Sequence, residues 1–415
     1  MAEAQRRTMR RNIRELPGPA WILLAGNCIN WFASFAIIFL ALYLTKRGFS
    51  IPEAGGAVAA FGGGGVAAGL IAGHLADRFG RRTTMAVSMF ASAATVLLLY
   101  FIRPYPALLA LAFAAGLATN TWRPASRALM ADVVPEGQRV TAFALTRFAG
   151  HVGYASGAAV AGFLADHSFL WVFVMDAATS VIFGLLVLLA LPEGRRTTKS
   201  EDVERGGYAT IAADKAFLLL FAASAFVAFI FAQQQSTLPL YVERILHLRP
   251  ADFGLLVSLN GVLVLAIELP ISSVTMRHPP KQMMGVGFLL FGAGFALTAT
   301  AHNLLALLGT VAIWTLGEIV SAPVAYAYLA DIAPEHLRGR YQGIYELAWG
   351  FGGVAGPALG AVLLAWSVNG VWAVCGALGL AASVLVLASP QRGPLGAEPT
   401  IVLPEAEPAA ITPPL

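Results

Sequence analysis

The sequence predicts an all-α membrane protein with twelve transmembrane helices in two related six-helix bundles. Three observations support this fold class. Of the 415 residues, 58% are apolar and only 12% are charged, the apolar residues gather into long runs, and the second half of the chain repeats a motif of the first. Soluble domains carry about 25% charged residues, so these charges are too few to cover a water-soluble surface. Most of the surface is therefore expected to face lipid.

Each expected helix is an apolar run of roughly 20 residues, the length that crosses about 30 Å of hydrocarbon. In the first half the runs are 19–44, 56–75, 84–102, 106–129, 140–165 and 169–191. In the second half they are 215–242, 252–275, 283–301, 303–329, 340–366 and 369–389. The first run is longer than the core of a signal peptide, so we expect it to be retained as a helix.

These runs predict five regions along the chain. They are a basic cytoplasmic N-terminus at 1–18, a first bundle at 19–191, a polar cytoplasmic linker at 192–214, a second bundle at 215–389 and a proline-rich, disordered cytoplasmic tail at 390–415.

The distribution of basic residues predicts the orientation in a bacterial inner membrane. Of the 27 Lys and Arg residues, most fall in loops on the side of the two termini, which we therefore expect to be cytoplasmic. The loops on the other side hold only Lys46, Arg47, Arg103, Arg244 and Arg249. Because the basic residues sit in short loops between apolar runs, nucleic acid is not an expected partner.

An internal repeat supports the division into halves. The segment Ala131–Glu136 (ADVVPE) recurs as Ala330–Glu335 (ADIAPE), 199 positions later, and Pro124 recurs at the same offset as Pro323. Each segment joins the fourth helix of its half to the fifth. Parallel repeats related by an axis along the membrane normal place a binding site between the halves, near the membrane midplane.

The loop between the second and third helices, Gly73–Arg82 (GHLADRFGRR), resembles the signature loop of the major facilitator superfamily. The resemblance implies the fold of that superfamily and transport by alternating access. It also implies a conformational charge cluster that holds the outward-open state: Gly73, Asp77, Arg78, Gly80, Arg81, Arg82 and Asp132. In the second half Met276 stands at the acidic position, so the cluster is expected in the first half only. The arginines could instead serve only to set the topology.

A second resemblance lies in the tenth helix. The segment Thr315–Val320 (TLGEIV), followed by Pro323, resembles the membrane-embedded carboxylate region of drug:proton antiporters of the LmrP type. Proton-coupled peptide transporters have a similar pattern. Two antiporter features are missing here: Ala112 and Ala115 replace polar residues in the fourth helix, and the fifth helix lacks the proline of the antiporter motif.

Ionisable residues within the apolar runs are functional candidates, because an unpaired charge in a membrane costs several kcal/mol. Glu318 is the expected proton-coupling residue, with Glu346 as a second site. Arg147 and Glu268 lie at similar depth on the fifth and eighth helices, and we predict an ion pair that closes an inner gate. Alternatively, Arg147 extends toward lipid headgroups. Asp176 is expected to be structural.

The resemblance places the first, fourth, seventh and tenth helices around a central cavity. The candidate substrate contacts on these helices are Asn27, Asn30, Trp31, Arg123, Gln234, Gln235, Trp314, Glu318 and Tyr326. The amides could instead join neighbouring helices through hydrogen bonds. An aromatic cavity with one or two carboxylates suits lipophilic or cationic compounds.

The sequence thus predicts a monomeric, proton-coupled exporter of lipophilic or cationic small molecules that needs no cofactor or metal. The alternative is a proton-coupled importer of peptides or other nutrients with Glu318 in the same role. The first helix has Asn27 and Asn30 where peptide transporters carry an E-x-x-E-R pattern, which favours export. No catalytic motif is present, so an enzyme is not expected.

Overall fold

The computed structural model describes residues 13–193, 208–334 and 337–390. The helices of the first half are α2 (Gly18–Ala33), α3 (Leu40–Lys46), α4 (Ile51–Phe79), α5 (Arg81–Phe101), α6 (Tyr105–Val133), α7 (Arg139–His167) and α8 (Phe169–Ala190). Those of the second half are α9 (Tyr208–Ala213), α10 (Lys215–Leu240), α11 (Pro250–Thr275), α12 (Pro280–Leu297), α13 (Leu304–Ile332), α14 (Arg338–Trp366) and α15 (Val368–Leu387). A π-helical turn, η2 (Tyr241–Ile245), extends α10.

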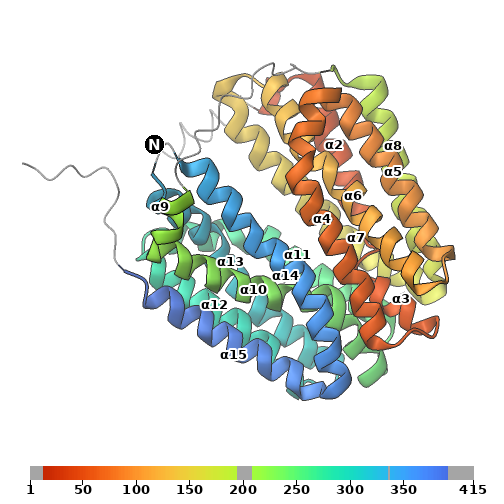
Figure 1. The fold of residues 1–415 in the computed structure, drawn as a ribbon, viewed down its shortest axis with the longest axis vertical. Coiled ribbons are helices and arrows are strands. Elements are labelled where there is room, and N and C mark those ends of the chain that lie inside the picture. The colour runs from red at the N-terminus through yellow and green to blue at the C-terminus, as the bar shows by residue number, and fades with distance from the viewer. Residues whose placement is uncertain (1–12, 194–207, 335–336, 391–415) are drawn as a thin grey trace, which may run out of the picture.

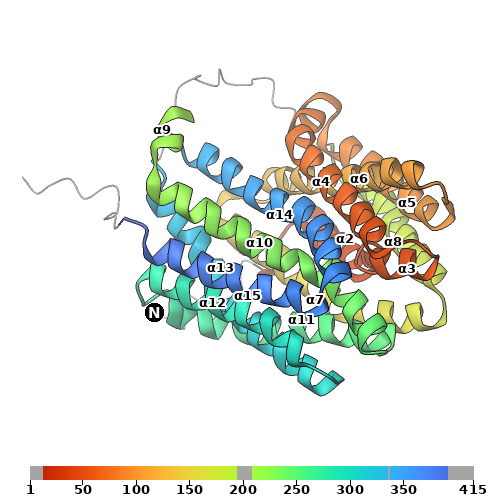
Figure 2. The same cartoon turned by 60° about the horizontal axis from the view of Figure 1, so that its bottom comes forward.

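The helices form two bundles that lie side by side. Figure 1 shows α2–α8 as one bundle and α10–α15 as the other, and Figure 2 shows the same division from another side. An apolar core runs through each bundle. In the first, the rings of Trp122 and Phe183 meet edge to face with their centroids 5.2 Å apart. In the second, the ring centroids of Trp314 and Phe295 are 5.3 Å apart. The bundles meet where α4 contacts α14 and where α7 contacts α11.

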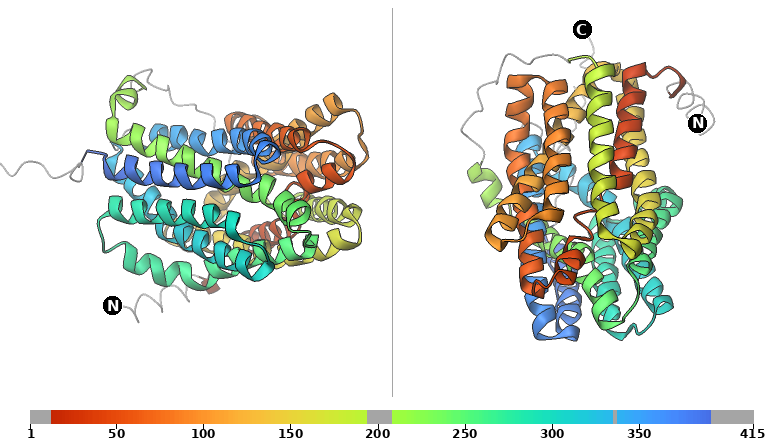
Figure 3. Two further views of the ribbon diagram at one scale, coloured as in Figure 1. Left: turned by 90° about the horizontal axis from the view of Figure 1, so that it is seen from below. Right: turned by 90° about the vertical axis from the view of Figure 1, so that its right-hand side faces the viewer.

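Within the described residues, ten helices are long and apolar enough to cross a membrane. The two further expected spans are α2 with α3, and α6. Helix α2 has only 16 residues, and the second half of α6 carries polar side chains that include Asn120 and Arg123. Both nevertheless pack inside the first bundle, α2 against α7 and α8 and α6 against α4 and α5 (Figure 3).

The first expected helix, 19–44, is not continuous, which corrects the prediction from the sequence. Helix α2 ends at Ala33 and α3 begins at Leu40. The break frees backbone N–H groups that need hydrogen-bond acceptors, and the buried carboxylate of Asp176 in α8 accepts from the N–H of Ala36 at 3.2 Å. The apolar run continues across the break, so hydropathy could not reveal it. Asp176 is therefore buried and accepts a backbone hydrogen bond, which fits the structural role expected from the sequence.

The expected linker, 192–214, is partly helical, because its last residues form α9. Asp214 caps α10: its Oδ1 accepts from the N–H of Ala216 at 3.1 Å and of Phe217 at 3.2 Å. The hydroxyl of Tyr341 donates to its other carboxylate oxygen at 2.9 Å. Residues 1–12, 194–207 and 391–415 lie outside the described residues, so the expectations for the N-terminus, the rest of the linker and the disordered tail stay predictions.

Helices α4 and α14 touch at one end of the molecule and separate at the other. A Cβ on Gly55 would lie 2.6 Å from the carbonyl oxygen of Pro357, and Gly62 lies directly against Gly353, so glycine permits this contact. Farther along, Cβ atoms placed on four glycines would meet nothing within 4 Å: Gly69, Gly73, Gly339 and Gly343. We call the separated end, where α4 ends and α14 begins, the inner end, following the topology expected from charge. The opposite end is the outer end.

Helices α7 and α11 cross between the bundles along more of their length. A Cβ on Gly162 would lie 2.9 Å from the Cα of Gly254, and one on Gly261 would lie 2.7 Å from the Cβ of Ala155. The hydroxyl of Ser258 donates to the carbonyl of Ala155 at 2.7 Å. The α7–α11 contact therefore joins the bundles through small residues, while the inner part of α4 and α14 is open.

Candidate functional site

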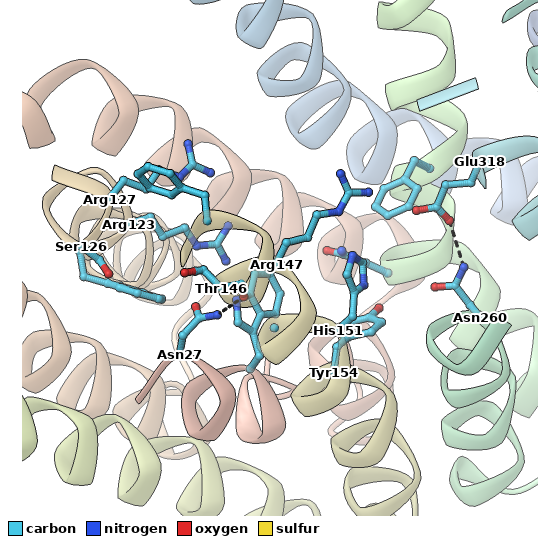
Figure 4. Close-up of a pocket in the computed structure, with 16 residues that line it drawn as sticks. Asn27, Arg123, Ser126, Arg127, Thr146, Arg147, His151, Tyr154, Asn260 and Glu318 are labelled. Carbon is cyan, nitrogen blue, oxygen red and sulfur yellow. Dashed lines mark hydrogen bonds between the residues drawn. The ribbon is translucent and has the colours of Figure 1, made fainter. Parts of the chain in front are cut away.

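A cavity of about 530 Å³ lies between the two bundles, within the usual range for small-molecule sites. Figure 4 shows its polar lining. The lining residues come from α2 (Asn27, Trp31), α6 (Trp122, Arg123, Ser126, Arg127), α7 (Phe143, Thr146, Arg147, Gly150, His151, Tyr154), α10 (Phe231, Gln235), α11 (Asn260) and α13 (Glu318). Because both bundles supply its wall, a relative movement of the bundles changes the cavity.

Glu318 is the carboxylate on the cavity wall. Its Oε2 accepts a hydrogen bond from the Nδ2 of Asn260 at 3.0 Å, and the same nitrogen donates to the hydroxyl of Thr315 at 3.1 Å. In the described part of the chain, Glu318 forms no ion pair. Figure 4 shows its carboxylate at the side of the cavity formed by the second bundle. A carboxylate held in this way can exchange a proton with water in the cavity.

The opposite side of the cavity carries arginines. The guanidinium of Arg123 lies over the ring of Trp31, with its Cζ 4.6 Å from the ring centroid. Its Nε has no hydrogen-bond partner among the residues that the structure describes. Arg127 follows one helical turn later on α6, and Figure 4 shows both side chains on the side away from Glu318. The amide of Asn27 donates to the carbonyl of Thr146 at 2.8 Å, which joins α2 to α7 beside these arginines.

Two prolines mark the helices that carry these charges. Pro124 lies inside α6 directly after Arg123, and Pro323 lies inside α13 five residues after Glu318. A proline has no backbone N–H and so leaves the carbonyl one turn earlier without its helical donor. The repeat in the sequence thus places an interrupted hydrogen-bond ladder beside the cavity in each bundle.

Arg147 and Glu268 form the ion pair that the sequence suggested. The pair crosses from α7 to α11, and the side chains are 57% and 16% exposed respectively. The inner ends of α4 and α14 are apart in the same structure, as the open space beside Gly69 and Gly343 shows. The pair alone therefore does not bring those ends together, and its role in an inner gate stays a prediction.

The signature loop forms a compact set of polar contacts in the first bundle. Arg81 pairs with Asp132 and donates to the carbonyl of Ala128 at 2.9 Å. Gly80 has a φ of 92°, which glycine adopts without strain, and it forms the turn between α4 and α5. Arg82 pairs with Glu193 at 3.1 Å, a partner that the motif did not predict.

The other members of this loop are exposed at the inner end. Asp77 and Arg78 are exposed on the last turn of α4, and Gly73, one turn before Asp77, faces open space. This exposure fits a conformational charge cluster that is not engaged in this structure. The action of the loop in the outward-open state stays a prediction.

Five of the nine predicted substrate contacts line the cavity: Asn27, Trp31, Arg123, Gln235 and Glu318. The other four do not, which corrects the expectation from the sequence. Asn30 is buried beside the sulfur of Met89 at 3.8 Å, and Trp314 is 1% exposed in the apolar core. Gln234 is also 1% exposed. Successive helical residues point about 100° apart, so only one of the adjacent glutamines faces the cavity.

Tyr326 and Glu346 lie together outside the cavity lining. The tyrosine hydroxyl donates to the Oε1 of Glu346 at 3.4 Å, between α13 and α14. Glu346 is exposed at the inner part of α14. Glu346, the expected second proton site, is therefore an exposed residue, whereas Glu318 lies on the wall of the cavity.

The sequence analysis missed several lining residues, above all Arg127, His151, Tyr154 and Asn260. Arg127 is one of the basic residues that the charge distribution assigned to the cytoplasmic side. His151 follows Arg147 by four residues, so it shares a helical face with a residue already singled out. Asn260 is a lone amide in an otherwise apolar run, and this was a usable signal.

The outer end carries a contact between the bundles that the sequence also did not reveal. The Nζ of Lys46 in α3 lies 2.6 Å from the Oε1 of Glu243 in η2. Next to it, the guanidinium of Arg244 donates to the carbonyl of Thr45 at 2.6 Å. We call these four residues the outer clasp. Lys46 and Arg244 had appeared only as charges outside the membrane, because contacts between helix ends leave no periodic signal in a sequence.

Loss of the outer clasp is expected to favour closure of the inner end. With Glu243→Gln, a cysteine introduced at Gly69 should react more slowly with a maleimide, because the population facing inward falls. An exposed ion pair contributes about 0.2–1 kcal/mol, so we expect up to roughly a fivefold change. The control is Arg249→Gln, which removes the pair between the exposed side chain of Arg249 and Asp252 at the start of α11, a pair that does not join the bundles. Equal labelling in wild type and Glu243→Gln would contradict the assignment.

Comparison with known proteins gives relatives over most of the chain. The family model described as Major Facilitator Superfamily matches residues 21–248 and 220–407. The chain is 26% identical to an uncharacterized MFS-type transporter, YhjO, of Bacillus subtilis (strain 168), over 71% of this chain and 73% of the relative. It is also 26% identical to the multidrug resistance protein MdtH of Aeromonas hydrophila subsp. hydrophila, over 79% and 83%.

Three further comparisons concern ion exchange and the fold. A Na(+), Li(+), K(+)/H(+) antiporter of Planococcus maritimus is 26% identical over 70% of this chain and 77% of the relative. A crystal structure of the peptide transporter POT in complex with sulfate is similar with a TM-score of 0.71 at 18% identity, over 89% and 93% of the two chains. A D-xylose-proton symporter is similar with a TM-score of 0.69 at 18% identity, over 90% and 97%. With its helical bundles, its signature loop and the family match along both halves, this chain is a multi-pass membrane transporter that belongs to the major facilitator superfamily.

Proposed function

We propose that this protein is a proton-coupled exporter of amphipathic small molecules in the bacterial inner membrane, with both termini in the cytoplasm. The observation that supports this proposal most directly is the position of Glu318. Its carboxylate faces a cavity lined by both bundles and accepts a hydrogen bond from Asn260. A relative named as a multidrug resistance protein and another named as a cation/proton antiporter support export coupled to ions.

The contacts between the bundles support an inward-facing starting state. The outer clasp joins the outer end, and the glycine faces of α4 and α14 are apart at the inner end. Substrate enters from the cytoplasmic side while Glu318 is ionised. The bundles then rock about their α7–α11 contact, the inner ends of α4 and α14 meet, and the outer clasp opens. A proton from outside binds Glu318, substrate leaves, and the protonated carrier returns.

The lining of the cavity refines the expected substrate. Trp31, Trp122, Phe143, Tyr154 and Phe231 supply aromatic surface, which suits an apolar body. Three lining side chains are arginines and one is a carboxylate. This charge balance does not suit cations, so we propose lipophilic and amphipathic compounds and omit the cationic class that the sequence suggested.

A second candidate function, proton-coupled import of peptides, is favoured by one observation. The cavity has positive side chains on α6 and a carboxylate on α13 (Figure 4), an arrangement that fits the two charged ends of a zwitterion. In this case the substrate and the proton cross the membrane in the same direction.

Purified protein in liposomes with an imposed pH gradient separates the two candidates. Aromatic dyes and dipeptides are added in turn, and proton flux and substrate flux are recorded together. Export by exchange predicts that a dye moves against the proton flux and that dipeptides have no effect. Proton flux that carries dipeptides in its own direction would select import, and substrate flux without any proton flux would overturn coupling altogether.

A further inference from the structure

The charges on the cavity wall do not balance. Arg147 is neutralised by Glu268 across the bundle interface. Glu318 and Asn260 lie on the other side of the cavity. This leaves Arg123 and Arg127 on α6, neither of which forms an ion pair in the ranges that the structure describes.

The two arginines reinforce each other's positive potential. They are four residues apart, and each lies within electrostatic range of the other. Like charges at this spacing destabilise a helix unless something compensates them. Glu346 lies within electrostatic range of Arg127 but belongs to α14 and does not line the cavity. Within the cavity lining, α6 therefore contributes two arginines and no carboxylate.

The geometry of Arg123 suits the recognition of an anion. Its guanidinium lies on the face of Trp31, which holds the group in place, and its buried Nε has no hydrogen-bond partner in the described part of the chain. An arginine that is held flat in this way presents fixed N–H groups, which match the two oxygens of a carboxylate. The hydroxyl of Ser126, between the two arginines in sequence, lines the same wall.

We propose that Arg123, Arg127 and Ser126 form a subsite for the anionic group of an organic acid whose apolar part lies on the aromatic surface of the cavity. The proposal rests on the proposed function, since it names the substrate class of the same cavity. The subsite lies in a cavity walled by both bundles, so a soluble acid is its occupant. The phosphate of an anionic lipid has the same charge chemistry and is distinguished in the experiment.

Equilibrium binding to the full chain in nanodiscs of zwitterionic lipid tests the subsite. The probes are 1-naphthoic acid, 1-naphthalenemethanol and 1-naphthylmethylamine, which share one ring and differ in charge. We expect the acid to bind at least about tenfold more tightly than the alcohol, as one charge-assisted hydrogen-bonded contact provides. Equal affinity for acid and alcohol, or a preference for the amine, overturns the proposal.

Substitutions test which arginines produce the preference for the acid over the alcohol. Arg123→Gln should remove most of the preference for the acid while leaving the affinity for the alcohol, which shows that the cavity is still folded. Arg127→Gln, at an exposed side chain, is a second variant that should lower the preference without a folding defect. Arg277→Gln removes an exposed positive charge at the inner end of α11 and should change nothing. An acid preference that survives in both α6 variants overturns the subsite.

Two further arms separate the remaining outcomes. If the acid preference disappears in nanodiscs that contain an anionic lipid, the subsite belongs to a lipid headgroup and the proposal fails. The second arm measures coupled proton flux in liposomes for the same protein. Coupled proton flux without an acid preference would defeat this inference alone, and an acid preference without proton flux would defeat only the proposed coupling.

Discussion

Glu318→Gln is expected to abolish proton-coupled transport while substrate binding persists. Glutamine has the size of glutamate and keeps an oxygen that accepts from Asn260, so the wall of the cavity is preserved. It cannot bind and release a proton, so the return step loses its driving force. Proton flux driven by substrate in liposomes should fall to the level of empty vesicles, while equilibrium binding of the same compound should remain close to that of wild type.

The matched control is Glu346→Gln, which changes the same group at an exposed position outside the cavity lining. We expect this variant to retain coupled flux. If Glu346→Gln loses coupling and Glu318→Gln keeps it, the proton site has been assigned to the wrong helix. If both variants keep it, no glutamate of this pair carries the proton.

Breaking the ion pair between Arg147 and Glu268 is expected to lower the stability of the protein, and this is the second large effect that we predict. Removing one member leaves the other unpaired, and the cost follows its burial. The side chain of Glu268 is 16% exposed and that of Arg147 is 57% exposed. Arg147→Met should therefore cost more stability than Glu268→Gln, by about 1–2 kcal/mol after allowance for the exposure of the arginine. Thermal denaturation of the purified variants measures the difference.

A charge swap provides the control for that prediction. Arg147→Glu combined with Glu268→Arg restores opposite charges on α7 and α11, so it should recover part of the stability and transport lost in the single variants. The interaction energy from the full mutant cycle then reports the pair itself. Independent, additive effects of the two substitutions would show that the contact contributes nothing and would remove it from any account of gating.

Much of the architecture could be predicted because it depends on composition and short motifs. The helical fold and most helix positions follow from apolar runs about as long as a bilayer is thick. The resemblance of the signature loop indicated the family and implied the charge cluster in which Arg81 pairs with Asp132. The break between α2 and α3 could not be predicted in this way. It lies within an uninterrupted apolar run and depends on Asp176, a side chain that is distant in the sequence.

The site was less accessible to sequence reasoning for geometric reasons. The resemblance to the superfamily placed α2, α6, α10 and α13 around the cavity. The side chains of one helical turn point in every direction, so the sequence could not distinguish Gln235, which lines the cavity, from Gln234, which is buried. Residues on α7 and α11 line the cavity because those helices lie where the bundles cross. That placement comes from tertiary packing, for which a single sequence carries little information.

The glycines at the inner ends of α4 and α14 should tolerate a larger side chain in one state of the proposed transport cycle and not in the other. A larger side chain at Gly69 or Gly343 meets empty space in the present arrangement. The same side chain would act as a wedge once the two helices approached each other. In the proposed transport cycle, a larger side chain at either glycine should therefore stop the carrier before the inner ends close, without a change to the residues that line the cavity.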